Sequence, residues 1–355
     1  MAEKTLMKGN EALAEAALRA GCKCFFGYPI TPQTEIAAYL SKRMPKVGGT
    51  FLQAESEVAA INMIYGCAGS GIRCMTSSSS PGISLKTEGI SYIAGADLPC
   101  VIINVQRGGP GLGGIQPSQS DYWQVTHALG HGDFHALVFA PASVQEMADT
   151  VTMAFDRADK YRMPAVILAD GLLGQMMEPV AFEDAEIVLS DASKKPWAAN
   201  GHGNKRKHNI INSLFLQPAE LEAKIRERFE RYETVKANET IGVAENCDDA
   251  EIVVVAYGST ARLAKSAAEQ ARAEGIKAGV FRPVTLWPFP VKELNEACKT
   301  AKKVLTVEMS MGQMVDDVRL ALDCRLPVEF FGRTGGVIPS PAEIRNKIKE
   351  MGGNA

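Results

Sequence analysis

Long hydrophobic runs, an excess of charge and paired cysteines are all missing from this chain of 355 residues. No stretch approaches the roughly 18 consecutive apolar residues of a transmembrane helix, and the first residues, MAEKTLMKGN, lack the apolar core of a signal peptide. We therefore expect a cytoplasmic protein with no membrane segment. Lysine and arginine number 38 against 41 aspartates and glutamates, and this near balance disfavours nucleic acid or an anionic membrane as a partner.

Ligands for a metal ion are also scarce. The eight cysteines include no C-x-x-C pair, the spacing typical of zinc and iron–sulfur ligands, and most of them stand in apolar segments. His127, His131 and His135 are spaced four apart, but Gly130 and Gly132 disfavour the helix that would bring three imidazoles to one metal. The sequence predicts no metal site and no iron–sulfur cluster on this chain.

Strand-like and helix-like segments alternate through the first 182 residues. The first helix is expected from Asn10, with Asn10 as its N-cap, and the strands are expected at residues 24–27, 50–52, 73–76, 100–105, 136–140 and 165–169. Such alternation predicts an α/β fold whose mainly parallel sheet is covered on both faces. Ligands bind these sheets beyond the carboxyl ends of the strands, where the Gly-, Ser- and Pro-rich runs of this chain lie.

The alternation stops from residue 183 to 249. Between residues 192 and 219 there is no acidic residue, but there are five lysines or arginines and two histidines. This composition fits a phosphate-binding arm or, more simply, a solvated linker that crosses a neighbouring surface. We expect the solvated linker rather than the phosphate-binding arm.

A packed surface helix is predicted at residues 218–236, because four apolar side chains share one helical face: Leu221, Ile225, Phe229 and Tyr232. A second, smaller α/β unit follows from residue 250 to 355, where four strand-like segments alternate with three helices.

Two polar loops are candidates for ligand contact. Gly109 to Gly114 satisfies the pattern G-x-G-x-x-G, but Pro117 interrupts the helix that a dinucleotide site requires. We interpret this loop as one that lets some ligand approach the backbone closely. The run Ser77 to Ser80, just before Pro81-Gly82, predicts a strand-to-helix turn that offers hydroxyl and N–H groups to an anion.

Glu55 and Glu57 open an apolar helix, and Arg107 leaves an apolar strand. Two positions on a helix differ by about 200°, so one carboxylate can face a site while the other faces solvent. Both glutamates fit equally well as partners of the helix dipole. Arg107 either grips a carboxylate with two hydrogen bonds or forms a surface ion pair. These residues alone leave both alternatives open.

Taken together, longer motifs resemble the alpha subunit of 2-oxoacid:ferredoxin oxidoreductases, and in detail the branched-chain (2-oxoisovalerate) type. In the first half they are GNEALAEAALRAGC, FGYPITPQTEI, FLQAESEVAAINM, SSSSPGISLKTEGISYIAGADLPCVI and QRGGPGLGGIQPSQSD. In the second half they are VVVAYGSTARLAKSA, FRPVTLWPFP, VEMSMGQMVDDVR and GRTGG. The resemblance covers nearly the whole chain, with residues 183–249 contributing least.

The resemblance implies a thiamine-diphosphate enzyme that oxidatively decarboxylates a 2-oxo acid to acyl-coenzyme A and carbon dioxide while reducing ferredoxin. It implies a pyrimidine-side domain at residues 1–182, a linker with one amphipathic helix at 183–249, and a smaller transketolase C-terminal-like domain at 250–355. The implied substrate is 2-oxoisovalerate, with 2-oxoglutarate or pyruvate as the alternative. A non-catalytic scaffold subunit is a more distant alternative.

The resemblance also assigns roles to individual residues. Glu57, rather than Glu55, matches the glutamate that contacts the aminopyrimidine N1′ of the cofactor. Thr31 of the Y-P-I-T-P motif and Arg107 match residues that hold the carboxylate or keto oxygen of the substrate. Pro29 and Ile30 of the same motif are expected to contact the cofactor.

One part of the family pattern is missing. The motif that binds magnesium and diphosphate starts with Gly-Asp-Gly and ends in Asn, whereas here Ala169 precedes Asp170-Gly171 and no fitting Asn follows. We therefore expect the diphosphate and Mg²⁺ on a beta subunit and the iron–sulfur clusters on partner subunits, including a ferredoxin-like gamma or delta subunit. By itself the chain is expected to be inactive.

Overall fold

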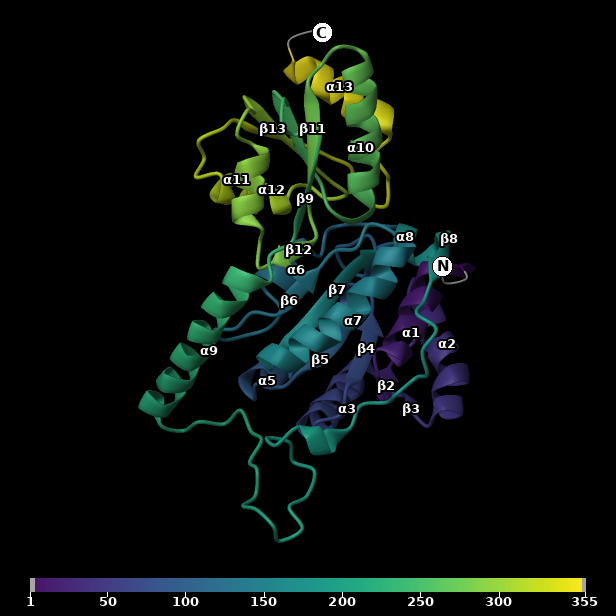
Figure 1. The fold of residues 1–355 in the computed structure, drawn as a ribbon, viewed down its shortest axis with the longest axis vertical. Helices are drawn as coiled ribbons and strands as arrows, with labels where there is room; N and C mark the ends of the chain where they lie inside the picture. The colour runs from purple at the N-terminus through teal and green to yellow at the C-terminus, as the bar shows by residue number, and fades with distance from the viewer. Residues whose placement is uncertain (1–3, 353–355) are drawn as a thin grey trace.

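The computed structural model describes residues 4–352, which form a larger and a smaller α/β unit (Figure 1). The larger unit contains the N-terminal half of the chain, and the smaller unit contains most of the C-terminal third. None of the helices in this range has both the length and the apolar character that a membrane crossing requires.

A seven-stranded sheet forms the centre of the larger unit. Its strand order is β12-β6-β7-β5-β4-β2-β3, and neighbouring strands are parallel except for β12 and β6. Every residue of β4, β5 and β7 is buried, and since successive side chains point to opposite faces, both faces are covered as predicted. The strands are β2 (Cys24–Gly27), β3 (Thr50–Gln53), β4 (Cys74–Ser78), β5 (Cys100–Gln106), β6 (Leu137–Phe139), β7 (Pro164–Asp170) and β12 (Thr285–Trp287).

The helices of the larger unit pack in pairs, with α1 against α7 and α3 against α5. Asn10 lies inside α1, and its side chain donates to the carbonyl of Pro32 at 2.8 Å. The prediction of Asn10 as the N-cap is therefore wrong, because Asn10 is the second residue of the helix. Its side-chain amide instead holds the loop after β2. The helices are α1 (Gly9–Arg19), α2 (Thr34–Arg43), α3 (Glu57–Gly69), α4 (Pro81–Ser84), α5 (Thr87–Gly95), α6 (Tyr122–Thr126), α7 (Val144–Tyr161) and α8 (Gly171–Gln175), with the 3₁₀ helix η1 (Met44–Val47).

A short antiparallel pair, which the sequence pattern did not predict, joins the two ends of the larger unit. Strand β1 (Lys4–Lys8) pairs with β8 (Met177–Ala181), and Leu6 lies opposite Pro179. The pair places the start of α1 next to the end of α8, because the N–H of Gly9 donates to the carbonyl of Met176.

The smaller unit is built on a five-stranded sheet of order β14-β13-β10-β11-β9. Only β9 is antiparallel to its neighbour, and it comes from the segment expected to be a linker with one helix. The strands are β9 (Gly242–Glu245), β10 (Ile252–Val255), β11 (Ala278–Pro283), β13 (Lys303–Glu308) and β14 (Val328–Gly332). The helices are α10 (Gly258–Ala273), α11 (Val291–Ala297), α12 (Met314–Ala321) and α13 (Pro341–Met351), of which α13 was not predicted.

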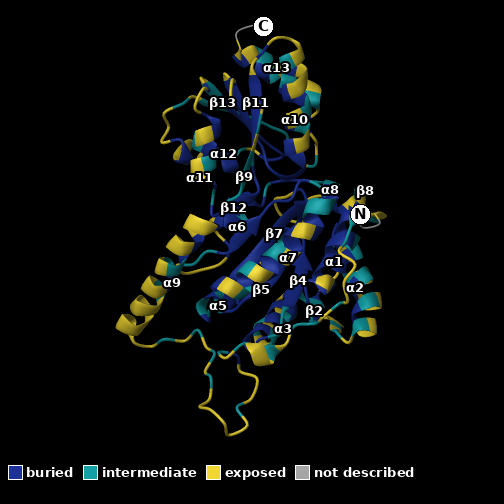
Figure 2. Cartoon of the chain, viewed as in Figure 1, coloured by how far each residue is buried: buried dark blue, intermediate teal, exposed yellow. Residues whose placement is uncertain are grey.

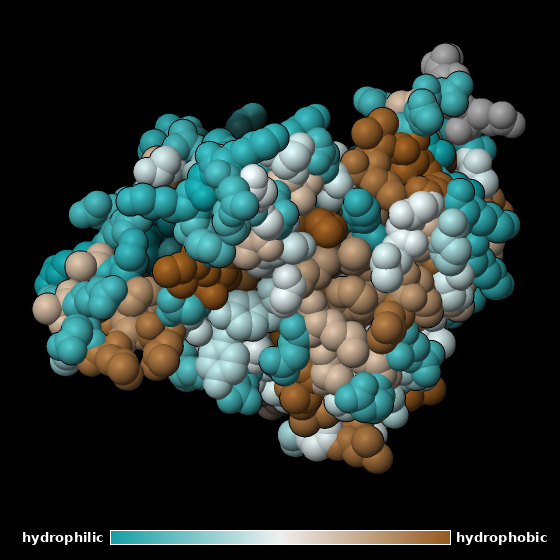
Figure 3. All heavy atoms as spheres, turned by 90° about the horizontal axis from the view of Figure 1, so that it is seen from below, coloured by the Kyte–Doolittle hydropathy of each residue, from teal (hydrophilic) through white to brown (hydrophobic). Residues whose placement is uncertain are grey.

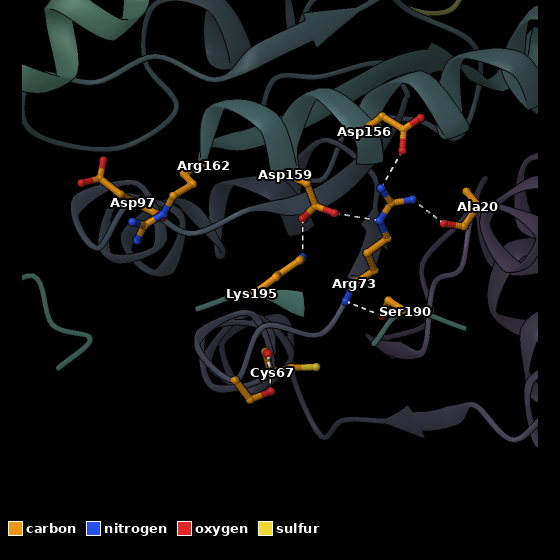
Figure 4. Close-up of polar contacts among 10 residues, drawn as sticks. Ala20, Cys67, Arg73, Asp97, Asp156, Asp159, Arg162, Ser190 and Lys195 are labelled. Carbon is orange, nitrogen blue, oxygen red and sulfur yellow. Dashed lines mark hydrogen bonds and ion pairs between the residues drawn. The ribbon is translucent and has the colours of Figure 1, made fainter. Parts of the chain in front are cut away.

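Residues 183–217, here called the strap, run along the larger unit with little regular structure beyond the 3₁₀ helix η2 (Ala192–Lys194) (Figure 1). The backbone N–H of Arg73 donates to Ser190 Oγ at 2.9 Å, and Lys195 forms an ion pair with Asp159 (Figure 4). Asp159 also pairs with the Arg73 side chain. The strap thus crosses a neighbouring surface, as expected of the linker.

Helix α9 (Pro218–Asn238) connects the strap to the smaller unit, and its two halves differ in burial (Figure 2). Tyr232 is 1% exposed, whereas Leu221, near the start of the same apolar face, is 40% exposed. The prediction of a packed surface helix therefore holds only for the C-terminal half. Seen from below, the surface of the molecule carries several hydrophobic patches (Figure 3). Three apolar side chains of the strap are exposed: Ile210, Leu214 and Leu216.

Buried hydrogen bonds join the two units. The Gln119 side chain donates to the carbonyl of Tyr257 at 2.8 Å and accepts from Thr260 Oγ1 at 2.6 Å and from the N–H of Met309 at 3.0 Å. Strand β12, from the C-terminal half of the chain, adds a further connection because it pairs with β6. The larger sheet is thus completed by residues that follow the smaller unit's first strands in the sequence.

Candidate functional site

The predicted site residues gather beyond the carboxyl ends of four adjacent strands, β3, β2, β4 and β5. Pro29, Ile30 and Thr31 follow β2, Glu57 lies shortly after β3, and Arg107 follows β5 directly. This edge is where open parallel sheets bind their ligands. The structure therefore brings together residues that are far apart in the sequence.

Glu57 is placed by the start of α3. Ser56 is the N-cap, with extended backbone, and its Oγ accepts from the N–H of Ala59 at 3.1 Å. This cap puts Glu57 at the first helical position, where a carboxylate is stabilised by the helix dipole. Glu57 is 6% exposed, whereas Glu55 precedes the helix and is exposed. The prediction that both glutamates open the helix is therefore wrong for Glu55, which Ser56 leaves outside α3. The two carboxylates do differ in environment, as one of the two alternatives required.

The Glu57 carboxylate lies against Gly82, the second residue of α4. A Cβ on Gly82 would overlap Ser78 Oγ and lie 2.7 Å from Glu57 Oε1. Glycine is therefore required here to let the backbone of α4 approach the carboxylate. Ser78 Oγ and the neighbouring Ser79 Oγ are buried and have no hydrogen-bond partner among the described residues. These orphaned hydroxyls are available to a ligand.

The turn between β4 and α4 is held by a buried network that the sequence pattern did not reveal. Ser80 has a left-handed backbone with φ of 27°, a strained conformation for a residue with a side chain. Its Oγ donates to Asp121 Oδ2 at 2.6 Å and accepts from the N–H of Arg107 at 3.0 Å. Asn104 donates to the same Asp121 oxygen at 2.9 Å. Burial raises the pKa of Asp121, against the effect of these hydrogen bonds.

Arg107 is buried and reaches from the end of β5 to the loop after β2. Nη1 donates to the carbonyl of Thr31 at 2.9 Å, and Nη2 donates to the carbonyl of Leu112 at 3.2 Å. Nε has no partner among residues 4–352. Because a guanidinium has five N–H groups and two are used, three remain for a ligand.

The loop after β2 presents Pro29 and Thr31 as exposed residues and Ile30 as a partly buried one. Gln33 fixes this loop, because its Nε2 donates to the carbonyl of Tyr28 at 3.2 Å and its Oε1 accepts from Ser77 Oγ at 2.5 Å. Gln33 was not singled out by sequence reasoning, although it belongs to the same motif. Its position explains how the loop is attached to β4.

Lys86 is a second residue that the sequence pattern did not mark. Its side chain is fully buried between β4 and the α4–α5 turn, and Nζ donates to Thr76 Oγ1 at 2.6 Å. Burial lowers the pKa of Lys86 to about 7, while the nearby Glu57 carboxylate acts in the opposite direction.

Apolar side chains are exposed around this edge of the sheet. Val58 and Leu85 follow the Glu57 and Gly82 positions, and Leu112 and Ile115 project from the glycine-rich loop, with exposures from 45% to 83%. The same loop contacts the smaller unit, where Gly336 lies directly against Gln116. Apolar surface of this kind commonly marks a protein interface.

Asp170 is fully engaged in holding the structure. Its Oδ1 accepts from the N–H groups of Leu172 and Leu173, at 2.9 and 3.1 Å, and its Oδ2 accepts from Ser259 Oγ of the smaller unit at 2.6 Å. Burial raises the pKa of Asp170. Within residues 4–352, no group of three or more His, Cys, Asp or Glu side chains is arranged to hold a metal ion.

A cavity of about 840 Å³ lies away from the predicted site residues, where α9, β12, α11 and α12 meet. Trp287, His135 and Lys236 are part of its lining. None of the residues predicted from the sequence as a site lines it.

Comparison with known proteins identifies the family. The model for the thiamine-diphosphate-binding region of pyruvate flavodoxin/ferredoxin oxidoreductases matches residues 15–244. The model for core domain II of pyruvate:ferredoxin oxidoreductase matches residues 250–344. The chain belongs to the 2-oxoacid:ferredoxin oxidoreductase family. The family resemblance of the sequence motifs is thereby confirmed.

Curated members of the family cover the chain almost completely. A ketoisovalerate oxidoreductase subunit, VorB, from Methanothermobacter thermautotrophicus is 49% identical over 99% of this chain and 98% of the relative. A 2-oxoglutarate synthase subunit, KorA, from Methanothermobacter marburgensis is 34% identical over 99% of this chain and all of the relative.

Two solved structures share the fold. The 2-oxoglutarate:ferredoxin oxidoreductase from Magnetococcus marinus superposes with a TM-score of 0.85 at 28% identity, covering 98% of this chain and 65% of that longer chain. A split-gene transketolase superposes with a TM-score of 0.60 at 15% identity, which shows the fold alone. The predicted α/β class with a mainly parallel sheet and a transketolase-like arrangement is confirmed.

The site of this oxidoreductase subunit fits a bound thiamine diphosphate. The family model describes a domain that binds this cofactor. In the structure, the buried Glu57 carboxylate, Gly82 and the unpartnered Ser78 hydroxyl lie together at the end of β4, and the adjacent Ser79 hydroxyl is also without a partner among the described residues. A polar heterocycle that approaches the backbone here would satisfy these groups.

Proposed function

We propose that this chain is the subunit of a branched-chain 2-oxoacid:ferredoxin oxidoreductase that holds the pyrimidine side of thiamine diphosphate. The observation that carries the proposal is the buried Glu57 carboxylate at the start of α3, facing Gly82. The branched-chain substrate class is supported by 49% identity to a ketoisovalerate oxidoreductase subunit against 34% to a 2-oxoglutarate synthase subunit. 2-Oxoglutarate is the second candidate, because the structural neighbour at a TM-score of 0.85 is named for it.

Glu57 would hold a proton at the pyrimidine ring. Bound thiamine diphosphate supplies the nucleophilic carbon and the electron sink that decarboxylation of a 2-oxo acid requires. The Glu57 carboxylate would accept a hydrogen bond from the ring nitrogen N1′ and so would hold a proton there. Pro29 and Ile30 would contact the cofactor from the loop after β2.

Arg107 and Thr31 would bind the substrate. The free N–H groups of Arg107 present a planar fork to the carboxylate of the 2-oxo acid, a geometry that lysine does not provide. Thr31 is exposed and its backbone carbonyl accepts from this guanidinium, and we propose that its hydroxyl donates to the carboxylate or keto oxygen of the substrate. Both residues would hold the substrate through its carboxylate and keto oxygen.

The proposal includes partner chains. Relatives of this chain are named as subunits, so we place it in a multi-subunit complex that uses coenzyme A and ferredoxin. Mg²⁺ and the diphosphate group would be held by a beta subunit, and the iron–sulfur clusters by a gamma or delta ferredoxin-like subunit. The engagement of Asp170 with α8 and Ser259 supports this division of labour.

The three-part division of the chain is proposed on the same basis. Residues 1–182 would form the cofactor domain, 183–249 the linker and 250–355 the transketolase C-terminal-like domain. The family matches change at residues 244 and 250, which supports the second boundary.

The test is coenzyme-A-dependent reduction of a viologen dye by the reconstituted complex, with 2-oxoisovalerate, 2-oxoglutarate and pyruvate compared. We expect the highest kcat/KM with 2-oxoisovalerate. Glu57→Gln should lower turnover about a hundredfold or more, whereas the exposed neighbour Glu55→Gln should leave it unchanged. Turnover of Glu57→Gln near the wild-type rate would overturn the cofactor assignment, and it would favour a scaffold subunit.

A further inference from the structure

The first half of α9 extends past the body of the larger unit (Figures 1 and 2). The second half is anchored, because Arg228 and Arg231 both form ion pairs with Asp97. The Tyr232 side chain behind them is buried. Within the described part of the chain, the ion pairs of residues 218–227 are formed only with one another. Because a protein helix owes most of its stability to the packing of an apolar face, this overhang points to a neighbour outside the chain.

An apolar stripe runs along the overhanging half of α9. Its members recur every three or four positions and line a groove of about 590 Å³: Pro218, Leu221, Ile225 and Phe229. Leu214 and Leu216, which lead into the helix, are 70% and 79% exposed. Neighbouring exposed apolar residues of this kind mark a protein interface.

Charged residues flank the stripe in the same order on both sides. At about 100° per residue, Glu222 and Arg226 lie on one side of the stripe. Glu220 and Lys224 lie on the other side, and all four residues are exposed. On each side the acid precedes the base by four residues. Such a pattern is complementary to itself when the direction of the helix is reversed.

We propose that the start of α9 packs antiparallel against the same helix of a second copy of this chain, about a two-fold axis near Ala223. Leu221 then faces Ile225 of the second copy, and the reverse contact is equivalent, as a two-fold interface requires. On one side of the stripe, Glu222 faces Arg226 of the second copy. Parallel packing is disfavoured, because each charge would face its own counterpart of the same sign.

This surface fits a second copy better than it fits a different protein. Its two charged sides carry no net charge, so it does not select a strongly acidic or basic surface on another chain. Residues 210–229, from the exposed end of the strap to the end of the stripe, number 20, and a standard interface uses about 20–30 residues a side. The dimer does not rest on the proposed function, since Glu57, Arg107 and Thr31 are not part of the groove.

Sedimentation velocity of the full chain over a range of concentrations tests the dimer, with the variants Glu222→Arg, Arg226→Glu and the double variant that carries both. Each single variant sets like charges against each other across the two-fold axis, so we expect the dissociation constant of the dimer to rise at least about tenfold. The double variant exchanges acid and base and should dimerise like the wild type. Glu230→Arg is the matched control, because this exposed residue lies about 180° around the helix from Leu221.

An equimolar mixture of the two single variants is the decisive sample. One chain presents two bases on this side of the stripe and the other presents two acids, so we expect a heterodimer about as tight as the wild-type dimer. The ion pair between Glu222 and Arg226 within each helix stays broken in both chains. Rescue in the mixture therefore reports contact between the chains, and circular dichroism checks that each variant keeps its fold.

Three results would overturn the proposal. The first is a wild-type chain that stays monomeric at every concentration. The second is a dimer that neither single variant weakens. The third is weakened assembly, including assembly with the beta subunit, that neither the mixture nor the double variant restores, because a different chain would then cover the stripe. Glu57→Gln remains the separate test of the proposed function, and its outcome has no bearing on the dimer.

Discussion

The Arg107 guanidinium donates to the backbone carbonyl of Thr31 at 2.9 Å, although the two residues are 76 positions apart in the sequence. The bond joins the end of β5 to the loop after β2, across the intervening strand β4. The two residues proposed to bind the substrate are therefore held at a fixed distance by the protein itself. A shift of either loop would move both.

Arg107→Ala should therefore weaken substrate binding more than cofactor binding. We expect KM for 2-oxoisovalerate to rise at least about tenfold, because the carboxylate loses a charge-assisted contact. Arg107→Lys should recover only part of this, since lysine cannot form the fork. Steady-state kinetics and cofactor titration of the complex measure the two effects, with exposed Arg226→Ala as the control. Lost cofactor binding with an unchanged KM would contradict this role.

Gly82→Ala should damage the site through a single methyl group. The added carbon would overlap Ser78 Oγ and crowd Glu57 Oε1, so we expect thiamine-diphosphate affinity to fall about tenfold or more. Gly66→Ala in the middle of α3 is the matched control, because a Cβ there meets no atom within 4 Å. That control should raise the unfolding free energy by about 0.5–1 kcal/mol. Equal cofactor affinity in both variants would exclude a tight approach at Gly82.

The burial of Lys86 should appear in the pH dependence of stability. Its pKa is about 7 in the folded chain against 10.5 for the free side chain, so the unfolded state binds more protons between these values. The free energy of unfolding therefore gains a favourable contribution from Lys86 as the pH rises from 7 toward 10.5. Thermal unfolding across this range should show that Lys86→Met lacks the gain and is more stable than the wild type at pH 7. Parallel stability curves for both proteins would contradict the lowered pKa of Lys86 in the folded chain.

Gln119→Leu should loosen the contact between the two units. The substitution leaves the carbonyl of Tyr257, Thr260 Oγ1 and the N–H of Met309 buried without their partner. We expect a loss of about 2–4 kcal/mol in the free energy of unfolding by urea. Gln270→Leu, on the exposed face of α10, should change it little. A Gln119 variant as stable as this control would contradict the structural role.

Much of the fold is accessible from the sequence because its signals are local. The buried strands such as β5 and β7 are continuous apolar runs, and the different environments of Glu55 and Glu57 follow once Ser56 is recognised as the cap, because the cap leaves Glu55 outside α3. Strand β12 gave no such signal. It has three residues, and it becomes a strand only through pairing with β6, a contact that sequence periodicity does not contain.

The residues that the sequence pattern missed or misassigned depend on tertiary contacts in the same way. Asn10 looks like a helix cap because asparagine is common there, yet its amide is needed by the carbonyl of Pro32. Asp121 lies in an irregular loop, and only the fold places it against Ser80 and Asn104. Lys86 precedes a polar helix start, so its complete burial has no counterpart in the sequence pattern.

The insertion of β12 into the larger sheet has a consequence for how the chain folds. A protein ending at residue 249 would lack this strand, and the backbone groups of β6 would form an open sheet edge. Open edges of buried, apolar strands recruit other chains and lead to aggregation. The C-terminal half of the chain therefore covers this sheet edge by supplying β12. Until β12 has left the ribosome, the edge of the newly synthesised larger unit stays open to pairing with other chains.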